Sequence, residues 1–481
     1  MGQLTLSAVE EIEAPPAVVF GLFGVGAGAG WVFDALCDRI TVGAAVTLRA
    51  PFDGPNAEAL DIHGRICLVQ FGRRIDIAHE QPWRGRVTIR FEPTGVGTRV
   101  RLTASLDEFG LDWLMRRRGL ALPPPSTTSV RLGLLTSKSG PGSLFAAATD
   151  SLATLAVEEM NAEGGLAGRP VELVVGDDST DPEIGVAETW RLVRSGCRTI
   201  IVSTTSATFA PVARALGGSE VLLVQPVMNE GGLDGPLCLQ LGERPVDQLA
   251  AAARPLMRAA GGCRWFLAGN DYIWPHALNS SARHVLPALG GDVVGELYAP
   301  MGTRDFAPVI EAITAAGADV ILSSFVGADG AAFERQCHAM GLRDRCRTLA
   351  PAMDESTLER IGAAAGPGIY GVSGYYEDMD GDVNSSLLGR YKAAYGRWAP
   401  PLSSLSESAY EAARMWWIAA RHVGEDNPRA IAIQMRRQRF DLPRGRLAMD
   451  GGSGLVQPIL LAEAVGSTFC VRGVADPRSS R

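Results

Sequence analysis

Apolar and polar residues alternate in short runs along the first 105 residues, a period-two pattern typical of half-buried strands. One interruption, Ala17–Phe23, has the spacing of a short helix. Glu92-Pro-Thr-Gly-Val-Gly97 predicts a hairpin turn between two of the runs. The expected strands are Leu4–Ile12, Ile40–Ala50, Ile62–Ile77, Arg86–Phe91 and Thr98–Ser105. The pattern therefore predicts an α+β unit, with one helix followed by an antiparallel meander.

After residue 130 the pattern changes to apolar runs that alternate with helical periodicity. Val130–Leu135 is an apolar run, and Asp181-Pro182 predicts a helix that begins with an aspartate cap and a proline. Further buried strands are expected at Val171–Val175, Thr199–Val202, Val221–Val224, Trp265–Ala268, Val320–Ser323 and Ile369–Val372. Such alternation predicts parallel sheets covered by helices on both faces, and the length of this part favours two lobes over one.

The two patterns are separated by a proline-rich stretch, Leu122-Pro-Pro-Pro-Ser-Thr-Thr-Ser129. Consecutive prolines hold the backbone extended and the hydroxyl residues favour water, so we expect a solvated linker. The predicted division is a first domain at residues 1–120, a linker at residues 121–129, an α/β domain at residues 130–471 and a flexible tail at residues 472–481.

Composition places the chain among globular proteins that do not bind nucleic acid or membranes by bulk charge. Of its 481 residues 46% are hydrophobic, and 45 Lys and Arg against 53 Asp and Glu give a net charge of −8. No run of eighteen apolar residues occurs, so we expect no membrane insertion. The N-terminus shows no secretory pattern, and the eight cysteines contain no C-x-x-C pair, which indicates reduced, buried thiols. We therefore expect a cytoplasmic protein.

No motif for catalysis, metal binding or a cofactor stands out. Gly24–Ala29 fits a loose dinucleotide-loop pattern, but it follows an expected helix rather than a strand. Asp378–Asp382 begins like a calcium loop, but Val383 and Gly389 stand where that loop needs glycine and glutamate. The six histidines form no metal-ligating pair, and there is no nucleophile elbow or P-loop. We therefore predict that the chain is not an enzyme and holds no cofactor or metal.

Polar and aromatic residues follow several of the expected α/β strands, where open sheets bind ligands. Ser203–Thr208 follow one strand and precede a helix expected from Phe209, so they either bind a carboxylate or amide oxygen or cap the helix. Asp329 either meets an ammonium or amide group or caps a helix, and aromatic residues here either stack on a ligand or only pack. The candidate ligand-binding residues are Ser137, Thr205, Ser206, Ala207, Thr208, Gln225, Pro226, Tyr272, Trp274 and Asp329.

From about Val130 to Val471 the chain resembles the type I periplasmic-type binding proteins, the family of branched-chain amino acid, urea and short-chain amide receptors. The resemblance is carried by Gly133-Leu-Leu-Thr-Ser-Lys-Ser-Gly140, Glu159-Met-Asn-Ala-Glu-Gly-Gly-Leu-Ala-Gly-Arg-Pro170 and Gly269-Asn-Asp-Tyr-Ile-Trp-Pro275. It implies a two-lobed Venus-flytrap fold with three hinge crossings that closes on a small polar ligand. The implied lobes are about 130–247 with 375–440, and about 248–374 with 441–471.

Residue by residue, the resemblance points to a mixed pocket. Tyr272 and Trp274 match the aromatic pair of the amide receptor, whereas Thr205, Ala207 and Gln225 stand where it has tyrosine, serine and tyrosine. A further candidate, Asp329, falls near the position where leucine-type receptors place an acid for the ligand's ammonium group. The ligand class is therefore open between amides, urea and amino acids.

The first segment, roughly Leu4 to Met115, resembles the SRPBCC superfamily, nearest its heat-shock-ATPase-activator-like family. The carriers are Val9-Glu-Glu-Ile-Glu-Ala-Pro-Pro16, Pro82-Trp-Arg-Gly-Arg-Val-Thr-Ile-Arg-Phe-Glu-Pro93 and Gly97-Thr-Arg-Val-Arg-Leu102. The resemblance implies a helix-grip fold, a curved antiparallel sheet wrapped over a C-terminal helix, often with an apolar cavity. Only Phe109–Arg118 could supply that helix.

The sequence leaves three functions open. The first is a cytoplasmic sensor that binds a short amide, urea or amino acid and signals by lobe closure through the first domain. The second is the substrate-binding component of an ABC transporter for amides, urea or branched-chain amino acids. The third is a hydrophobic-ligand carrier or enzyme that acts through the SRPBCC-like domain. A regulatory protein partner and a homodimer are also left open.

Overall fold

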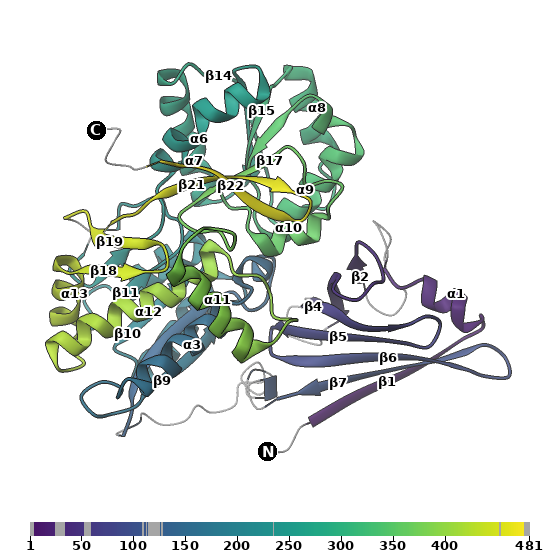
Figure 1. Cartoon of the computed structure of the whole chain (residues 1–481), viewed down its shortest axis with the longest axis horizontal. Coiled ribbons are helices and arrows are strands. Elements are labelled where there is room, and N and C mark those ends of the chain that lie inside the picture. Colours follow the sequence, from purple (N-terminus) through teal and green to yellow (C-terminus); the bar gives the residue numbers. More distant parts are fainter. Residues whose placement is uncertain are drawn as a thin grey trace.

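The computed structural model describes residues 4–24, 34–51, 59–107, 110–111, 113, 126, 128–233, 235–451 and 454–475. Within them the chain forms an antiparallel N-terminal sheet, two mainly parallel sheets and a small three-stranded sheet. Figure 1 shows the N-terminal sheet on the right, beside the lower of two α/β lobes, with the second lobe above. Most of the expected closing helix at Phe109–Arg118, most of the linker and most of Gly24–Ala29 lie outside the described residues.

The N-terminal sheet is a meander whose last strand pairs with its first. Its order is β1-β7-β6-β5-β4-β3-β2. The apolar side chains of the helix cover the sheet, since Val19 and Phe20 are buried in one cluster with Ile66, Ile75 and Ile89. Its elements are β1 (Leu4–Ile12), α1 (Pro16–Gly21), β2 (Asp34–Cys37), β3 (Ala45–Pro51), β4 (Ala59–Gln70), β5 (Arg74–Gln81), β6 (Gly85–Pro93) and β7 (Thr98–Leu106).

The predicted hairpin turn at residues 92–97 is confirmed, because Thr94 N–H donates to the Gly97 carbonyl over 2.8 Å between β6 and β7. One predicted strand is wrong: Ile62–Ile77 is two strands, β4 and β5, that pair with each other. They reverse at Gly72, whose φ of +66° is a conformation that glycine adopts without strain. A single glycine inside an apolar pattern was too weak a signal for that turn.

The lower lobe has a fully parallel sheet in the order β12-β11-β10-β8-β9. The predicted cap is confirmed, since Asp181 accepts the N–H groups of Glu183 and Ile184 at the start of α4. The strands are β8 (Val130–Thr136), β9 (Val171–Asp177), β10 (Thr199–Ser203), β11 (Leu222–Gln225) and β12 (Cys238–Gln240). The helices are α3 (Thr149–Ala162), α4 (Pro182–Arg194), α5 (Ser206–Ala215), α11 (Asp382–Tyr395), α12 (Ser404–Val423) and α13 (Pro428–Arg437).

The upper lobe has a sheet in the order β14-β13-β15-β16-β17-β21-β22, in which only the last two strands run antiparallel to their neighbours. Its strands are β13 (Arg264–Asn270), β14 (Asp292–Ala299), β15 (Val320–Ser324), β16 (Arg347–Leu349), β17 (Ile369–Ser373), β21 (Ile459–Val465) and β22 (Thr468–Ala475). Its helices are α6 (Pro245–Ala260), α7 (Ile273–Ala288), α8 (Ala307–Ala316), α9 (Gly327–Ala339) and α10 (Glu355–Ile361).

Two predicted boundaries near the C-terminus differ from the structure. The chain was expected to enter the second lobe at about residue 441, but β18 (Arg439–Leu442), β19 (Gly445–Met449) and β20 (Leu455–Val456) form a separate sheet. This sheet belongs to the lower lobe because Phe440 and Leu447 are buried in that lobe's core. The expected tail is also shorter, since β22 continues to Ala475.

A buried polar cluster ties together the three places where the chain crosses between the lobes. Glu243, on the first crossing, accepts the N–H of Gly374 on the second crossing over 2.6 Å. Arg444 donates to Glu243 over 3.0 Å and to Gln457, on the third crossing, over 2.8 Å. Gln457 in turn donates to the carbonyl of Leu241 over 3.1 Å. The hinge is thus held by one continuous hydrogen-bond network.

Two further carboxylates from α12 complete the surroundings of Arg444. Its Nε donates to Glu407 over 2.5 Å, and its backbone N–H donates to Glu411 over 3.0 Å. Burial raises the pKa of Glu411 well above the usual value, and the neighbouring Glu407 carboxylate adds to the shift. Burial alone would lower the pKa of Arg444, but the three glutamates raise it overall. The Arg444 guanidinium therefore offsets the cost of burying these carboxyl groups.

Replacing Arg444 by alanine should destabilise the chain by about 3–5 kcal/mol, because the substitution leaves buried carboxylates without their partner. The measurement is urea-induced unfolding. Arg446→Ala is the matched control, because Arg446 pairs with Asp441 on the surface and both side chains are more than 70% exposed. We expect the control to change stability by less than about 0.5 kcal/mol; equal losses in the two variants would contradict the role of Arg444.

Acid should weaken the structure through two buried histidines of the N-terminal sheet. Burial lowers the pKa of His63 from 6.5 to about 3, with the Arg360 guanidinium adding to the shift, and burial lowers that of His79 to about 4. Below pH 6.5 the unfolded state binds more protons than the folded state, so the free energy of unfolding falls as pH falls, by up to about 1.4 kcal/mol per pH unit for each histidine.

Between pH 6 and pH 4 the free energy of unfolding of the variant His63→Gln should fall less than that of the wild type. Of the two buried histidines, the variant keeps only His79 to cause the fall. Urea-induced unfolding across that range is the measurement. His422→Gln, at an exposed position near the end of α12, should follow the wild-type curve. Parallel curves for His63→Gln and the wild type would show that His63 is not the acid-sensitive group.

Candidate ligand site between the two lobes

The carboxyl ends of the strands of both lobes meet across a closed interface. In the lower lobe Ser203 pairs with Thr136, which brings the ends of β10 and β8 to one edge. In the upper lobe Ser324 pairs with Gly269 at the corresponding edge. The two edges touch: a Cβ at Gly327 of α9 would lie only 2.9 Å from the carbonyl oxygen of Pro141 in the lower lobe. The site between the lobes is therefore narrow and enclosed.

On the lower lobe, one of the predicted hydroxyls stays unpaired. The Oγ1 of Thr205 is buried and has no hydrogen-bond partner. Ser137 and Thr208 instead hydrogen-bond to the buried carboxyl of Asp178. Burying a hydroxyl without a partner costs about 1–3 kcal/mol, so Thr205 indicates a position where a polar group is expected to bind. Ser206 differs, because its hydroxyl already donates to Glu230 over 2.6 Å.

The start of α5 adds backbone donors to the same edge. Thr205 is the N-cap residue of α5, yet its side chain makes no capping hydrogen bond. Ala207 has no polar side chain, so it can contribute only its backbone N–H, which like that of Ser206 lacks an intrahelical acceptor. The partial positive charge at a helix N-terminus favours a carboxylate or another anionic group.

Gln225 and Pro226 lie at the end of β11, and Gln225 is largely committed within the lobe. The side-chain oxygen of Gln225 accepts from Gln240 over 2.8 Å. Pro226 is buried and offers no donor. These two residues therefore shape the lower wall rather than supply free polar atoms.

The predicted aromatic pair comes from the upper lobe. Tyr272 is the N-cap residue of α7, and Trp274 is buried at 2% exposure in the first turn, with its indole Nε1 unpaired. Burial raises the pKa of Tyr272 well above its usual value, and the Glu230 carboxylate of the lower lobe adds to the shift. Tyr272 therefore lies close to the opposite lobe, where it can take part in closure.

Asp329 does not present a free carboxylate oxygen in the way the resemblance implied. Its Oδ2 accepts from Asn270 over 2.7 Å and from the N–H of Gly302 over 2.8 Å, both within the upper lobe. Asn270 in turn accepts the N–H of Val326 over 3.0 Å, which anchors the chain before α9. Burial raises the pKa of Asp329 in spite of these donors. The geometry supports a bracing role for this residue.

A second group of unpaired polar atoms was not predicted from the sequence. It lies at the start of α10, which packs against the 3-10 turn η1 (Ser143–Ala146) of the lower lobe. Burial raises the pKa of Glu355 well above its usual value, although the N–H of Glu377 donates to its other oxygen over 2.9 Å. The buried unpaired atoms belong to Asp354, Glu355, Ser356, Thr357 and Tyr376.

The signal for this second group was present in the chain but weak. Four of these residues, 354–357, follow β16, which is only three residues long, Arg347–Leu349, and Tyr376 follows β17. The rule that ligands bind at the carboxyl ends of parallel strands would have pointed to the four if so short a strand had been recognised. Asp178 was also not predicted, although it follows a predicted strand, β9: it is fully buried, it hydrogen-bonds Ser137 and Thr208, and burial raises its pKa to about 6.

The described residues contain no group of three or more His, Cys, Asp or Glu side chains that could hold a metal ion. Within the same part of the chain, no helix is both long and apolar enough to cross a membrane. All eight cysteines are free, and Cys263 is exposed rather than buried as expected.

The periplasmic binding protein family matches residues 129–468, which is most of the chain. The chain belongs to the periplasmic binding protein family. Its curated relatives include a Leu/Ile/Val-binding protein of Rhizobium johnstonii, 26% identical over 46% of this chain and 60% of the relative. Another is the leucine-, isoleucine-, valine-, threonine- and alanine-binding protein of Pseudomonas aeruginosa, 21% identical over 69% of this chain and 88% of the relative. The chain spans only about 60% of the length of the Rhizobium relative and of a Leu/Ile/Val-binding protein homologue of Brucella melitensis.

Solved structures support the two-lobed fold. A periplasmic binding protein of Burkholderia mallei has a TM-score of 0.68 at 18% identity and covers 74% of this chain and 97% of its own. A solute-binding protein of R. palustris in complex with benzoate has a TM-score of 0.64 at 22% identity and covers 73% and 97%. A branched-chain amino acid binding protein of Streptococcus pneumoniae in complex with isoleucine has a TM-score of 0.66 at 19% identity and covers 73% and 100%.

These findings correct two predictions. The cytoplasmic location is wrong, because the relatives are periplasmic binding proteins of ABC transporters, which points to an extracytoplasmic protein. The cytoplasmic sensor is unsupported, and the transporter alternative agrees better with the relatives. The family match begins at residue 129, so it does not reach the N-terminal sheet. The relatives are solute-binding proteins rather than enzymes, in agreement with the predicted non-catalytic role.

If Asp329 braces the upper lobe, Asp329→Asn should destabilise the chain without any ligand by about 1–2 kcal/mol, because a carboxylate that accepts two hydrogen bonds becomes an amide with one acceptor. Thermal unfolding is the measurement. Asp292→Asn, at an exposed position at the start of β14, is the control and should leave the midpoint unchanged. An unchanged midpoint for Asp329→Asn would contradict the bracing role.

Proposed function

We propose that this chain is the substrate-binding component of an ABC transporter and binds a small carboxylate-bearing solute between its two lobes. One observation carries the proposal: at the facing edges of both sheets, buried polar atoms lack a partner, among them the hydroxyl of Thr205 below and an oxygen of Glu355 above. A solute that fills these hydrogen bonds stabilises the closed form, because the same groups are left unsatisfied without it.

The backbone donors of α5 set the orientation of the solute in this proposal. A carboxylate lies at the start of α5, near Ser206 and Ala207, where the helix dipole favours a negative charge. For an amino acid, the ammonium group meets the carboxyls of Asp354 and Glu355, each of which has an unpaired oxygen. The names of the relatives, which include Leu/Ile/Val-binding proteins, support an amino acid.

A second ligand class, an aromatic carboxylate, is favoured by a different observation. Tyr272 begins α7 on the upper lobe, near Glu230 of the lower lobe, and aromatic rings stack on one another. Trp274 is buried in the core of the upper lobe. Structurally similar proteins are solved in complex with benzoate and with 4-hydroxybenzoate. Such a solute needs the carboxylate subsite at α5 and no ammonium subsite.

For the N-terminal part we propose an SRPBCC-like helix-grip domain. The support is its topology: a helix after the first strand, followed by a meander whose last strand, β7, returns to pair with β1. The sheet has one buried apolar face under α1, around Phe20 and Phe91. Its role as a carrier or enzyme in its own right stays a hypothesis.

A thermal-shift screen tests the ligand class. The panel contains leucine, isoleucine, valine, benzoate, 4-hydroxybenzoate, acetamide and urea. A solute present at a hundred times its Kd adds about 2.7 kcal/mol to the stability of the protein that binds it. We expect a shift with an amino acid or an aromatic carboxylate and none with urea. A shift with urea or acetamide alone would overturn the carboxylate subsite, and no shift with any member would contradict the proposed ligand classes.

The variant Thr205→Val tests the position of the subsite. It should raise the Kd for the solute found in the screen by about tenfold, as for the loss of one buried hydrogen bond. Isothermal titration calorimetry is the measurement. Thr199→Val is the matched control, because Thr199 also has a buried, unpaired hydroxyl but lies at the start of β10, whereas Thr205 follows the end of that strand. Equal losses in the two variants would show that Thr205 acts through stability alone.

A further inference from the structure

The N-terminal sheet contacts both lobes at once, through three consecutive residues of β4, His63, Gly64 and Arg65. We propose that this strip is an intramolecular clamp: it joins the two lobes beside the closed cleft, so that docking of the N-terminal sheet and closure of the lobes are coupled. The inference goes beyond the proposed function, because it concerns closure itself and holds for any solute.

The first residue of the clamp strip binds the lower lobe. His63 is buried, and its Nε2 lies 2.9 Å from the hydroxyl of Ser143 in η1, while its Nδ1 lies 3.1 Å from Thr47 in the neighbouring strand. Ser143 belongs to the same β8–α3 connection as the ligand-site candidate Ser137. The N-terminal sheet therefore contacts the loop that forms one wall of the cleft.

The other two residues of the clamp strip bind the upper lobe. Arg65 forms an ion pair and a hydrogen bond with Glu359 of α10, and the carbonyl of Gly64 accepts from Arg360 over 3.4 Å. Asp38, after β2, adds a third contact, because a Cβ at Gly362 would lie 3.2 Å from its carboxylate. These contacts cover the end of the helix whose first turn contains Glu355.

A second contact joins the N-terminal domain to the cleft loop. The indole N–H of Trp113 donates to Asp177 over 2.9 Å. The other oxygen of Asp177 accepts the backbone N–H groups of Lys138 and Ser139 over 3.0 and 3.2 Å, directly after Ser137. The carboxylate that positions this part of the ligand site is thus also a docking contact for the N-terminal domain.

Opening of the lobes has to break one side of the clamp. In the closed form η1 of the lower lobe packs against α9 and α10 of the upper lobe. Adjacent residues of a strand are about 3.3 Å apart, so the clamp strip spans only about 7 Å and cannot follow two surfaces that separate. Because β4 lies inside the sheet, between β5 and β3, its backbone is held on both sides. Movement of α10 away from η1 therefore releases either Ser143 or Glu359.

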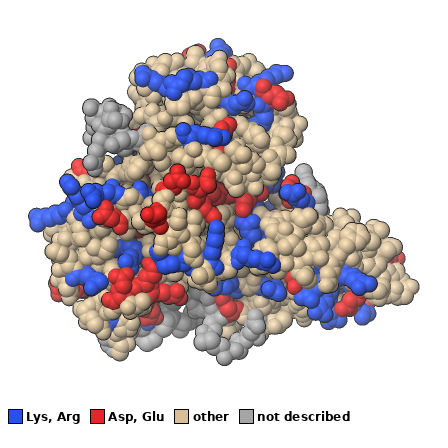
Figure 2. Space-filling view, in the orientation of Figure 1, with Lys and Arg blue, Asp and Glu red and all other residues tan. Residues whose placement is uncertain are grey.

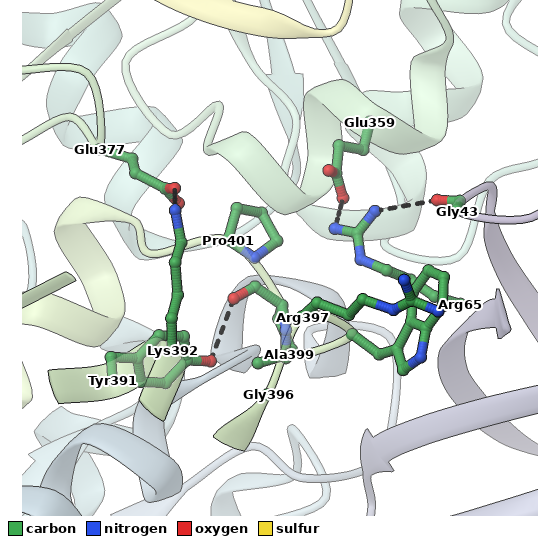
Figure 3. A pocket seen from close by; sticks show the side chains of 12 residues that line it. Gly43, Arg65, Glu359, Glu377, Tyr391, Lys392, Gly396, Arg397, Ala399 and Pro401 are labelled. Atoms are coloured by element: carbon green, nitrogen blue, oxygen red, sulfur yellow. Dashed lines mark hydrogen bonds and ion pairs between the residues drawn. The ribbon is translucent and has the colours of Figure 1, made fainter. Parts of the chain in front are cut away.

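The composition of this junction suits a contact that forms and separates. A hollow of about 220 Å³ remains where the three parts meet, lined among others by Arg65, Glu359 and Lys392 (Figure 3). Its walls combine ion pairs, such as Lys392 with Glu377 at 3.3 Å, with the apolar residues Trp398 and Pro401, and basic side chains line the same boundary in Figure 2. Polar contacts of this kind resemble transient rather than permanent interfaces.

Coupling of this kind is reciprocal. If docking of the N-terminal sheet stabilises the closed lobes, then closing the lobes on a solute strengthens docking by the same factor. A transporter or another partner that binds the exposed part of the N-terminal sheet would then bind the loaded and empty forms differently. The clamp thereby supplies a physical route from the ligand site to a surface outside the two lobes.

Hydrogen–deuterium exchange of the full-length chain without added solute tests the clamp. Arg65→Glu places a carboxylate against Glu359 and should raise exchange in both α10 and η1 by about fivefold, the scale of one ion pair. The double variant Arg65→Glu with Glu359→Arg restores the opposite charges and should return both segments toward the wild-type rate. Arg99→Glu is the matched control, because Arg99 pairs with Glu11 at 2.6 Å within the same sheet and away from the lobes.

The clamp is overturned if Arg65→Glu raises exchange in α10 alone and leaves η1 at the wild-type rate, because the contact is then local. It is equally overturned if the charge-swapped double variant does not recover, or if Arg99→Glu has the same effect as Arg65→Glu. If Arg65→Glu raises exchange throughout the chain, the milder variant Arg65→Gln replaces it. Its exchange is then measured in the same two segments, α10 and η1, with the same criteria. No solute takes part in the test, so its failure leaves the proposed function standing, and failure of the solute screen leaves the clamp standing.

Discussion

The buried guanidinium of Arg444 is the interaction on which the two-lobed arrangement depends. It sits where the chain crosses between the lobes and holds Glu243 and Gln457, while Glu407 and Glu411 approach from α12. A buried charge is costly unless it is paired and hydrogen-bonded, and here every side of the guanidinium is occupied. Because the network includes residues of all three crossings, it ties these crossings to one another.

Beside that hinge, the parallel sheets of the two lobes position the candidate ligand-binding residues at the ends of their strands. The carboxyl ends of their strands face each other, with the unpaired hydroxyl of Thr205 on one edge and an unpaired oxygen of Glu355 on the other. The acidic side chains that gather where the upper lobe meets the lower part in Figure 2 belong to the same region of the molecule. The family match agrees with a solute site at this position. The N-terminal sheet is a third unit, and it contacts both lobes.

The alternation of apolar runs and helices predicted the α/β strands, since buried parallel strands are recognisable by composition alone. It failed at Gly72, where one glycine reverses the chain, and at β18–β20, where the core contact of Phe440 rather than any local pattern assigns the segment to the lower lobe. The cytoplasmic location failed for another reason: it rested on the lack of a recognisable signal in the sequence, and the relatives contradict it.

The sequence by itself determined the order of the elements, the two-part division and the strand ends that carry polar residues, because these follow from local periodicity and residue type. Only the tertiary structure decided which of those polar atoms are free. Asp329 is committed to Asn270 and Gly302, whereas Thr205, also at a helix start, keeps an unpaired hydroxyl. Such differences depend on contacts between residues far apart along the chain, which a pattern of neighbours does not contain.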